Sequence, residues 1–162
     1  MNAAARLTVS APVITSEEVK TALKQRFPLI MVDCVVSLEK GKSIRAIKNV
    51  TINEVYCQRH SGGQAVLPPT LIVEAIGQSA SILFIRSTGF GTHPQEFLVL
   101  GSIQEMTFLK PVIPGDRMEI EAYVSKFVGA YAIVRAVVTV DQKEVAKGSL
   151  GFALRTLPAD LP

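Results

Sequence analysis

Two residues of this chain have side chains suited to proton transfer, and they lie fourteen positions apart. His60 lies in a segment rich in glycine and proline, and Glu74 lies in a run that is otherwise apolar. An imidazole titrates near neutral pH and suits a general base. An unpaired carboxylate is costly to bury, so Glu74 needs a partner or a function. A loop histidine alone is more often structural, so an acid/base site at His60 and Glu74 needs support from other features of the sequence.

The apolar run predicts the helix that carries the carboxylate. Residues from about Thr70 to Ser87 are apolar on nearly all sides, which is typical of a helix buried on most of its surface. Gln78 follows Glu74 by four residues on the same face, so it either orients the carboxyl or is an ordinary buried amide. Pro69 suits the first position of this helix, but it has no N–H to donate.

The remaining elements indicate an α+β domain. A capping box from Thr15 to Glu18 predicts a short helix from about Ser16 to Gln25, which Pro28 ends. We expect residues 1–15 to be flexible, residues 16–156 to form one domain, and residues 157–162 to be a tail. Apolar runs and alternation bounded by turn residues predict the strands Leu29–Leu38, Ser43–Ile52, Phe97–Met106, Thr107–Val112, Met118–Val128, Tyr131–Val140 and Glu144–Leu154.

Composition excludes several classes of protein. The net charge is +3 and the basic residues are dispersed, which argues against nucleic acid as a partner. No stretch approaches the ~20 apolar residues that a membrane-spanning helix needs, and the first residues lack a secretory signal. We therefore expect a cytoplasmic protein without membrane insertion. Cys34 and Cys57 lack metal-ligand spacing, so we expect reduced core cysteines and no metal site.

Four stretches resemble the FabZ-type (3R)-hydroxyacyl-acyl-carrier-protein dehydratases, which have the hot-dog fold. They are residues 26–33, 44–54, 60–78 and 110–116, in the family's order. The resemblance implies an antiparallel sheet wrapped around the helix at about Thr70 to Ser87. It also implies a dimer in which each site takes its histidine from one subunit and its carboxylate from the other, and larger assemblies of dimers occur in the family.

The resemblance further implies a reaction. A 3-hydroxyacyl thioester, carried by an acyl carrier protein, would lose water to give a trans-2-enoyl thioester in fatty-acid or polyketide-type biosynthesis, without a cofactor. His60 would be the base and Glu74 the acid, with Gln78 supporting Glu74. In the family, the backbone N–H at the position of Pro69 points at the thioester oxygen, so Gly63 or Thr70 would have to supply this donor here. The resemblance also implies that Tyr56 and Phe90 line an acyl tunnel. Lys110 and Arg59 would bind the carrier protein.

Two other interpretations stay open at this point. The missing N–H at Pro69 favours a non-catalytic or half-active subunit that forms a heterodimer with a sister dehydratase, whereas the presence of both His60 and Glu74 favours an active homodimer. An acyl thioesterase is the third interpretation, because the hot-dog fold alone does not specify dehydration.

Overall fold

The computed structural model describes residues 12–57 and 63–158. His60 and Arg59, predicted for catalysis and docking, lie outside the described residues. In chain order the elements are α1 (Ser16–Ala22), β1 (Cys34–Glu39), β2 (Ser43–Asn49), α2 (Pro69–Thr88), β3 (Glu96–Phe108), β4 (Arg117–Val128), β5 (Tyr131–Val140) and β6 (Lys143–Thr156). The strands form one antiparallel sheet with the order β1-β2-β4-β5-β6-β3.

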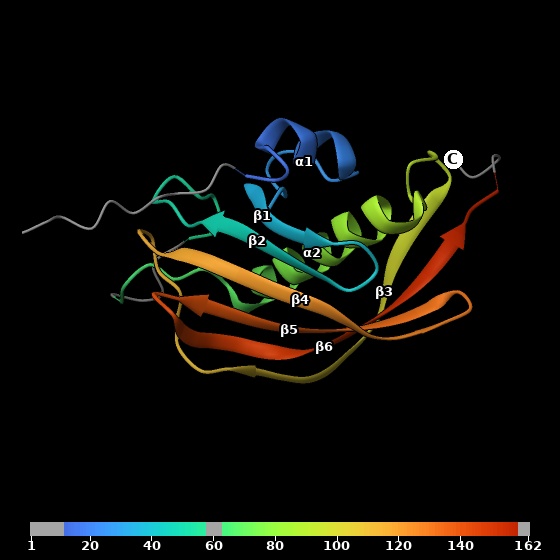
Figure 1. Cartoon of the computed structure of the whole chain (residues 1–162). Helices are drawn as coiled ribbons and strands as arrows, with labels where there is room; N and C mark the ends of the chain where they lie inside the picture. The colour runs from blue at the N-terminus through green and yellow to red at the C-terminus, as the bar shows by residue number, and fades with distance from the viewer. Residues whose placement is uncertain (1–11, 58–62, 159–162) are drawn as a thin grey trace, which may run out of the picture.

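The long helix α2 runs along one face of this sheet, as Figure 1 shows, and α1 lies near the β1 end. Alternate residues of β4 and β5, such as Ile120 and Val134, are buried in the core that includes α2. Because α2 contributes buried side chains on most of its circumference, its apolar sequence is explained by burial in the sheet's hollow. The predicted α+β hot-dog architecture is therefore confirmed.

The ends of α2 follow from local chemistry. Pro69 occupies the first helical position, where its fixed φ is favourable and its lack of an N–H removes no intrahelical bond. Gly89 ends the helix with φ 75, a left-handed conformation that suits glycine. The helix predicted from Thr70 to Ser87 is thus confirmed to within one residue at each end. Within the described part of the chain, neither helix has the length and apolarity needed to cross a bilayer.

The first helix is shorter than predicted. It ends at Ala22 rather than Gln25, and Leu23 is extended with ψ 148. The side chain of Leu23 is buried in the core, and Gln25 contacts α2 instead of continuing the helix. Strand β1 likewise begins at Cys34, not Leu29, because backbone groups of Leu29 and Met31 bond to a side chain of α2 rather than to a neighbouring strand.

The predicted strands Phe97–Met106 and Thr107–Val112 are one strand, β3, which ends at Phe108. Its pairing with β6 shifts register twice, and Glu105 has φ 52 near the second shift. Such bulges interrupt the alternation of side chains without ending the pairing, so they resemble a strand boundary in the sequence. The remaining expected strands match β2, β4, β5 and β6, with small differences at their ends.

Candidate active site

The carboxyl of Glu74 is half-buried on α2 and is held by two glutamines. Its Oε1 accepts a hydrogen bond of 2.8 Å from Gln78 Nε2 and one of 3.2 Å from Gln25 Nε2. Gln78 lies one helical turn further along α2, whereas Gln25 comes from the connector between α1 and β1. Two separate parts of the chain therefore fix the orientation of this carboxyl.

Gln78 is fully buried, and both the oxygen and the nitrogen of its amide make hydrogen bonds. Its Oε1 accepts the Met31 N–H at 2.8 Å, and its Nε2 donates to the Leu29 carbonyl at 2.7 Å as well as to Glu74. Because a backbone N–H needs an acceptor and a backbone carbonyl needs a donor, only one orientation of the amide satisfies all its partners. Gln78 is therefore both a satisfied core amide and a residue that orients Glu74.

The backbone N–H groups at the N-terminus of α2 differ in whether they have a hydrogen-bond partner. Pro69 has no N–H, and the Leu71 N–H donates to the Pro68 carbonyl at 2.9 Å. Thr70 is consequently the first residue of the helix that has an N–H, and no hydrogen bond of that N–H occurs among the described contacts. Thr70 and Gly63 are both exposed. The N–H of Thr70 lies at the positive end of the helix dipole, where an oxyanion is stabilised.

The segment that precedes residues 58–62 is anchored by a buried ion pair. Lys48 Nζ bonds to Glu54 Oε1, and their side chains are only 5% and 15% exposed. Lys48 Nζ also donates to the Asn49 carbonyl at 2.8 Å, and the Cys57 N–H donates to the Glu54 carbonyl at 3.1 Å. Partial burial raises the pKa of the Cys57 thiol, which disfavours the thiolate. Tyr56 is partly buried against the core.

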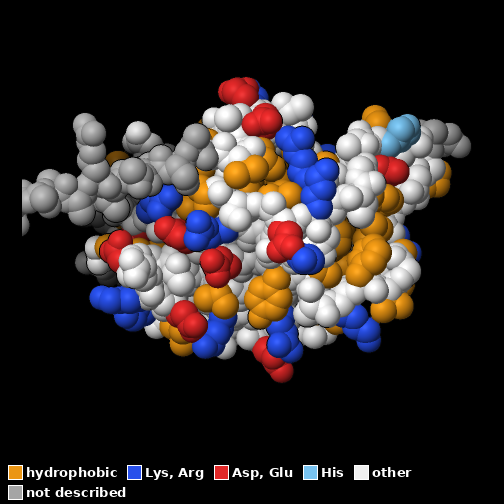
Figure 2. Space-filling view, viewed as in Figure 1, with side chains coloured by type: hydrophobic (Ala, Val, Ile, Leu, Met, Phe, Trp, Pro, Cys, Tyr) orange, Lys and Arg blue, Asp and Glu red, His pale blue; other side chains and the backbone are white. Residues whose placement is uncertain are grey.

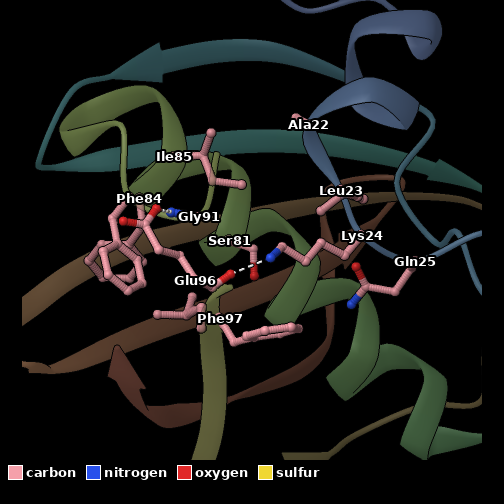
Figure 3. Close-up of a pocket in the computed structure, with 12 residues that line it drawn as sticks. Ala22, Leu23, Lys24, Gln25, Ser81, Phe84, Ile85, Gly91, Glu96 and Phe97 are labelled. Carbon is pink, nitrogen blue, oxygen red and sulfur yellow. Dashed lines mark hydrogen bonds between the residues drawn. The ribbon is translucent and has the colours of Figure 1, made fainter. Parts of the chain in front are cut away.

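A pocket of about 110 Å³ lies between the end of α1, the C-terminal half of α2 and the start of β3 (Figure 3). Its wall includes Gln25, so the pocket adjoins a group that holds Glu74. The wall is largely aromatic and apolar, and it includes Phe84, Phe90 and Phe97. The predicted tunnel residue Phe90 therefore lines a pocket next to Gln25, whereas Tyr56 is not part of its wall.

Lys24 joins the α1–β1 connector to the loop before β3 through hydrogen bonds. Its Nζ donates to the carbonyls of His93 at 3.0 Å, Pro94 at 2.8 Å and Glu96, and it lies 3.9 Å from the centroid of the Phe97 ring. Burial lowers the pKa of Lys24, although the nearby Glu96 carboxylate opposes this effect. These contacts place the neighbouring Gln25 between the pocket and Glu74.

Sequence reasoning missed Gln25 as part of the site. Gln25 immediately precedes the motif at residues 26–33, but its bond to Glu74 spans 49 positions and leaves no local spacing signal. The docking candidate Lys110 is exposed just beyond β3. Figure 2 shows basic and acidic side chains interleaved on the visible face, which agrees with the dispersed charge.

Comparisons with known proteins identify the family of the chain. A model of the FabA-like domain matches residues 23–149. The chain is 35% identical over 144 residues to the 3-hydroxyacyl-[acyl-carrier-protein] dehydratase FabZ of Salmonella arizonae, covering 89% of this chain and 95% of the relative. The FabZ protein of Salmonella newport matches with the same identity and coverage.

Solved structures agree with the fold. The dehydratase heterocomplex ApeI:P from Xenorhabdus doucetiae superposes with a TM-score of 0.70 and 11% identity, over 91% of this chain and 93% of that one. The protein smu.793 from Streptococcus mutans, bound to acetyl CoA, superposes with a TM-score of 0.61 and 19% identity, over 82% and 94%. Together with the fold and the match over residues 23–149, these findings show that the chain belongs to the FabA-like family of hot-dog proteins.

Proposed function

We propose that this protein is a hydro-lyase that removes water from 3-hydroxyacyl thioesters bound to an acyl carrier protein, in fatty-acid or polyketide-type biosynthesis. The observation that carries the proposal is the 35% identity to FabZ dehydratases over 89% of the chain. The half-buried Glu74 carboxyl, oriented by Gln25 and Gln78, supports it because a hydro-lyase needs a positioned acid.

Two residues carry out the two proton transfers of the reaction. His60 takes a proton from C2 of the acyl chain, and the electrons of that C–H bond form the C2–C3 double bond. The C3–O bond breaks, and the hydroxyl leaves as water with a proton from Glu74. The role of His60 rests on the resemblance of residues 60–78 to the family's catalytic motif, since His60 lies outside the described residues. The protons balance when His60 gives up its proton and Glu74 takes one up, either by direct transfer or through solvent.

Negative charge on the thioester oxygen needs a donor, and Thr70 is the best candidate. Its N–H is the first of α2 and has no partner among the described contacts. Loss of one oxyanion donor lowers the rate by about 10²–10³-fold. Another N–H must therefore replace the one that is absent at Pro69 if the reaction is to keep its rate. The exposed Gly63, before the helix, is the second candidate.

The exposed edge of β3 supports a dimer. Strand β3 is 13 residues long and lies at the end of the sheet. Three of its exposed apolar side chains are Val99, Leu100 and Ile103, and Ile103 is 53% exposed. A long apolar edge strand is a liability unless another strand covers it. Pairing of two β3 strands would join two sheets and bring residues of both subunits toward one site.

The other two interpretations are not favoured by the comparisons. The matched relatives are dehydratases, and the chain retains both His60 and Glu74. A heterodimer of active subunits stays compatible with this proposal, because the similar ApeI:P structure is a heterocomplex. Lys110 is an exposed cation that we propose for carrier docking, together with Arg59.

Incubation of the purified protein with a 3-hydroxybutyryl carrier protein, followed by intact mass spectrometry, tests the proposal. We expect the carrier to lose one water with the wild type, and no loss with His60→Ala or Glu74→Gln. Release of free carrier thiol would instead indicate a thioesterase. Activity that requires a second hot-dog subunit would indicate an obligate heterodimer.

A further inference from the structure

We propose that Gln25 is a positioning residue of the active site, which selects Oε2 of Glu74 as the oxygen that gives its proton to the leaving hydroxyl. The inference rests on the proposed acid role of Glu74. It starts from the two hydrogen bonds that converge on Oε1, at 2.8 Å from Gln78 and 3.2 Å from Gln25. Among the described residues, Oε2 makes no such bond.

The two donors distinguish the oxygens of the carboxyl. A carboxyl oxygen has two lone pairs in its plane, and two N–H groups on Oε1 occupy both. The neutral carboxyl therefore carries its proton on Oε2. When that proton leaves, negative charge develops on the carboxylate, and hydrogen bonds to a charged acceptor are stronger than bonds to a neutral one. The same two bonds thus stabilise the product of proton donation more than the acid.

Gln78 alone does not provide this selection. One N–H of its amide is already bound to the Leu29 carbonyl, so only the other reaches Glu74. A single donor would leave one lone pair of Oε1 open, and either oxygen could then hold the proton. Gln25 supplies the second donor. The reverse orientation of the Gln25 amide would place two acceptor oxygens against each other, which is unfavourable.

The connector holds Gln25 in place from both sides. On one side Leu23 is 2% exposed, and the Lys24 ammonium binds carbonyls of the loop before β3. On the other side Arg26 Nη1 donates to the carbonyls of Leu23 and Gln25, each at 2.7 Å. These two cations of the connector are bound to carbonyls and make no ion pair with Glu74. The contact between the connector and the Glu74 carboxyl is therefore the hydrogen bond from the neutral amide of Gln25, and not an ion pair with Lys24 or Arg26.

The test compares three variants of the full-length protein. Gln25→Met keeps the length of the side chain without a donor, and Gln25→Asn keeps the amide but is one methylene shorter, so neither bonds to Glu74. Lys20→Met on α1 is the matched control, because Lys20 is exposed and lies away from the described site. Steady-state kinetics are measured against pH with a 3-hydroxybutyryl carrier protein, and thermal unfolding checks that each variant is folded.

We expect Gln25→Met and Gln25→Asn to lower kcat about tenfold with little change in KM, and to move the alkaline limb of the kcat profile up by about one pH unit. The bond to a charged acceptor is worth roughly one such unit. Lys20→Met should match the wild type. A Gln25→Met variant with wild-type kcat and an unmoved alkaline limb would overturn the inference while leaving the dehydratase function intact.

A second measurement does not depend on activity. Infrared difference spectra of the free protein during a pH titration report the carboxylic C=O stretch of Glu74, which Glu74→Gln identifies by its loss. We expect Gln25→Met to move the midpoint of that band up by about one pH unit. An unmoved midpoint contradicts the inference whether or not the protein dehydrates the substrate, and absence of dehydration by the wild type contradicts the proposed function instead.

Discussion

Replacement of Gln78 by leucine should destabilise the protein strongly, because Gln78 is the buried link between α2 and the α1–β1 connector. The side chain is 0% exposed, and Met31, whose N–H it accepts, is 1% exposed. Gln78→Leu keeps the approximate volume but leaves this buried N–H without an acceptor. A buried unsatisfied donor costs about 1–3 kcal/mol, and loss of the bonds to the Leu29 carbonyl and to Glu74 adds about 1 kcal/mol. We expect a total of about 2–4 kcal/mol.

Urea denaturation measures this loss, at a fixed protein concentration because the stability of the proposed dimer would depend on concentration. Ser79→Ala is the matched control. Ser79 is also 0% exposed on α2, but its hydroxyl donates only to the Ala75 carbonyl four residues earlier, at 2.8 Å. That carbonyl accepts from the helix in any case, so we expect the control to lose less than about 1 kcal/mol. Equal losses in the two variants would refute the view that Gln78 joins these segments.

Three further predictions concern the ion pair, the helix start and the strand edge. Lys48→Met should cost about 3 kcal/mol in urea denaturation, because it leaves Glu54 nearly buried without its partner, and adding Glu54→Gln should restore part of the loss. Because the Thr70 N–H is the proposed oxyanion donor, Pro69→Gly should change kcat by less than about tenfold, and a rise of about 10²-fold would contradict the assignment of Thr70. Ile103→Lys, at the β3 edge, should yield monomers in light scattering, whereas Tyr123→Lys on β4 should stay dimeric.

The sequence predicts α2 well because its signals are local. The helix is apolar on most sides and lies between Pro69 and Gly89, which have clear conformational preferences. Glu74 and Gln78 are four residues apart, so their contact follows from helical geometry. Their role in a dehydratase, by contrast, comes from the family resemblance and not from the spacing.

The parts that could not be predicted depend on tertiary contacts. The first helix ends early because Leu23 and Gln25 make contacts with distant parts of the chain. The bulges of β3 break the side-chain alternation, so one strand has the pattern of two. The bond from Gln25 to Glu74 joins residues 49 positions apart, and no periodicity in the sequence points to it.

The most direct test of the central claim is the intact mass of a 3-hydroxyacyl carrier protein after incubation with the wild type and with Glu74→Gln. The claim predicts that the carrier loses one water with the wild type and keeps its mass with the variant, whose folded state is verified by thermal unfolding. Loss of water at the wild-type rate with Glu74→Gln would contradict the assignment of Glu74 as the acid.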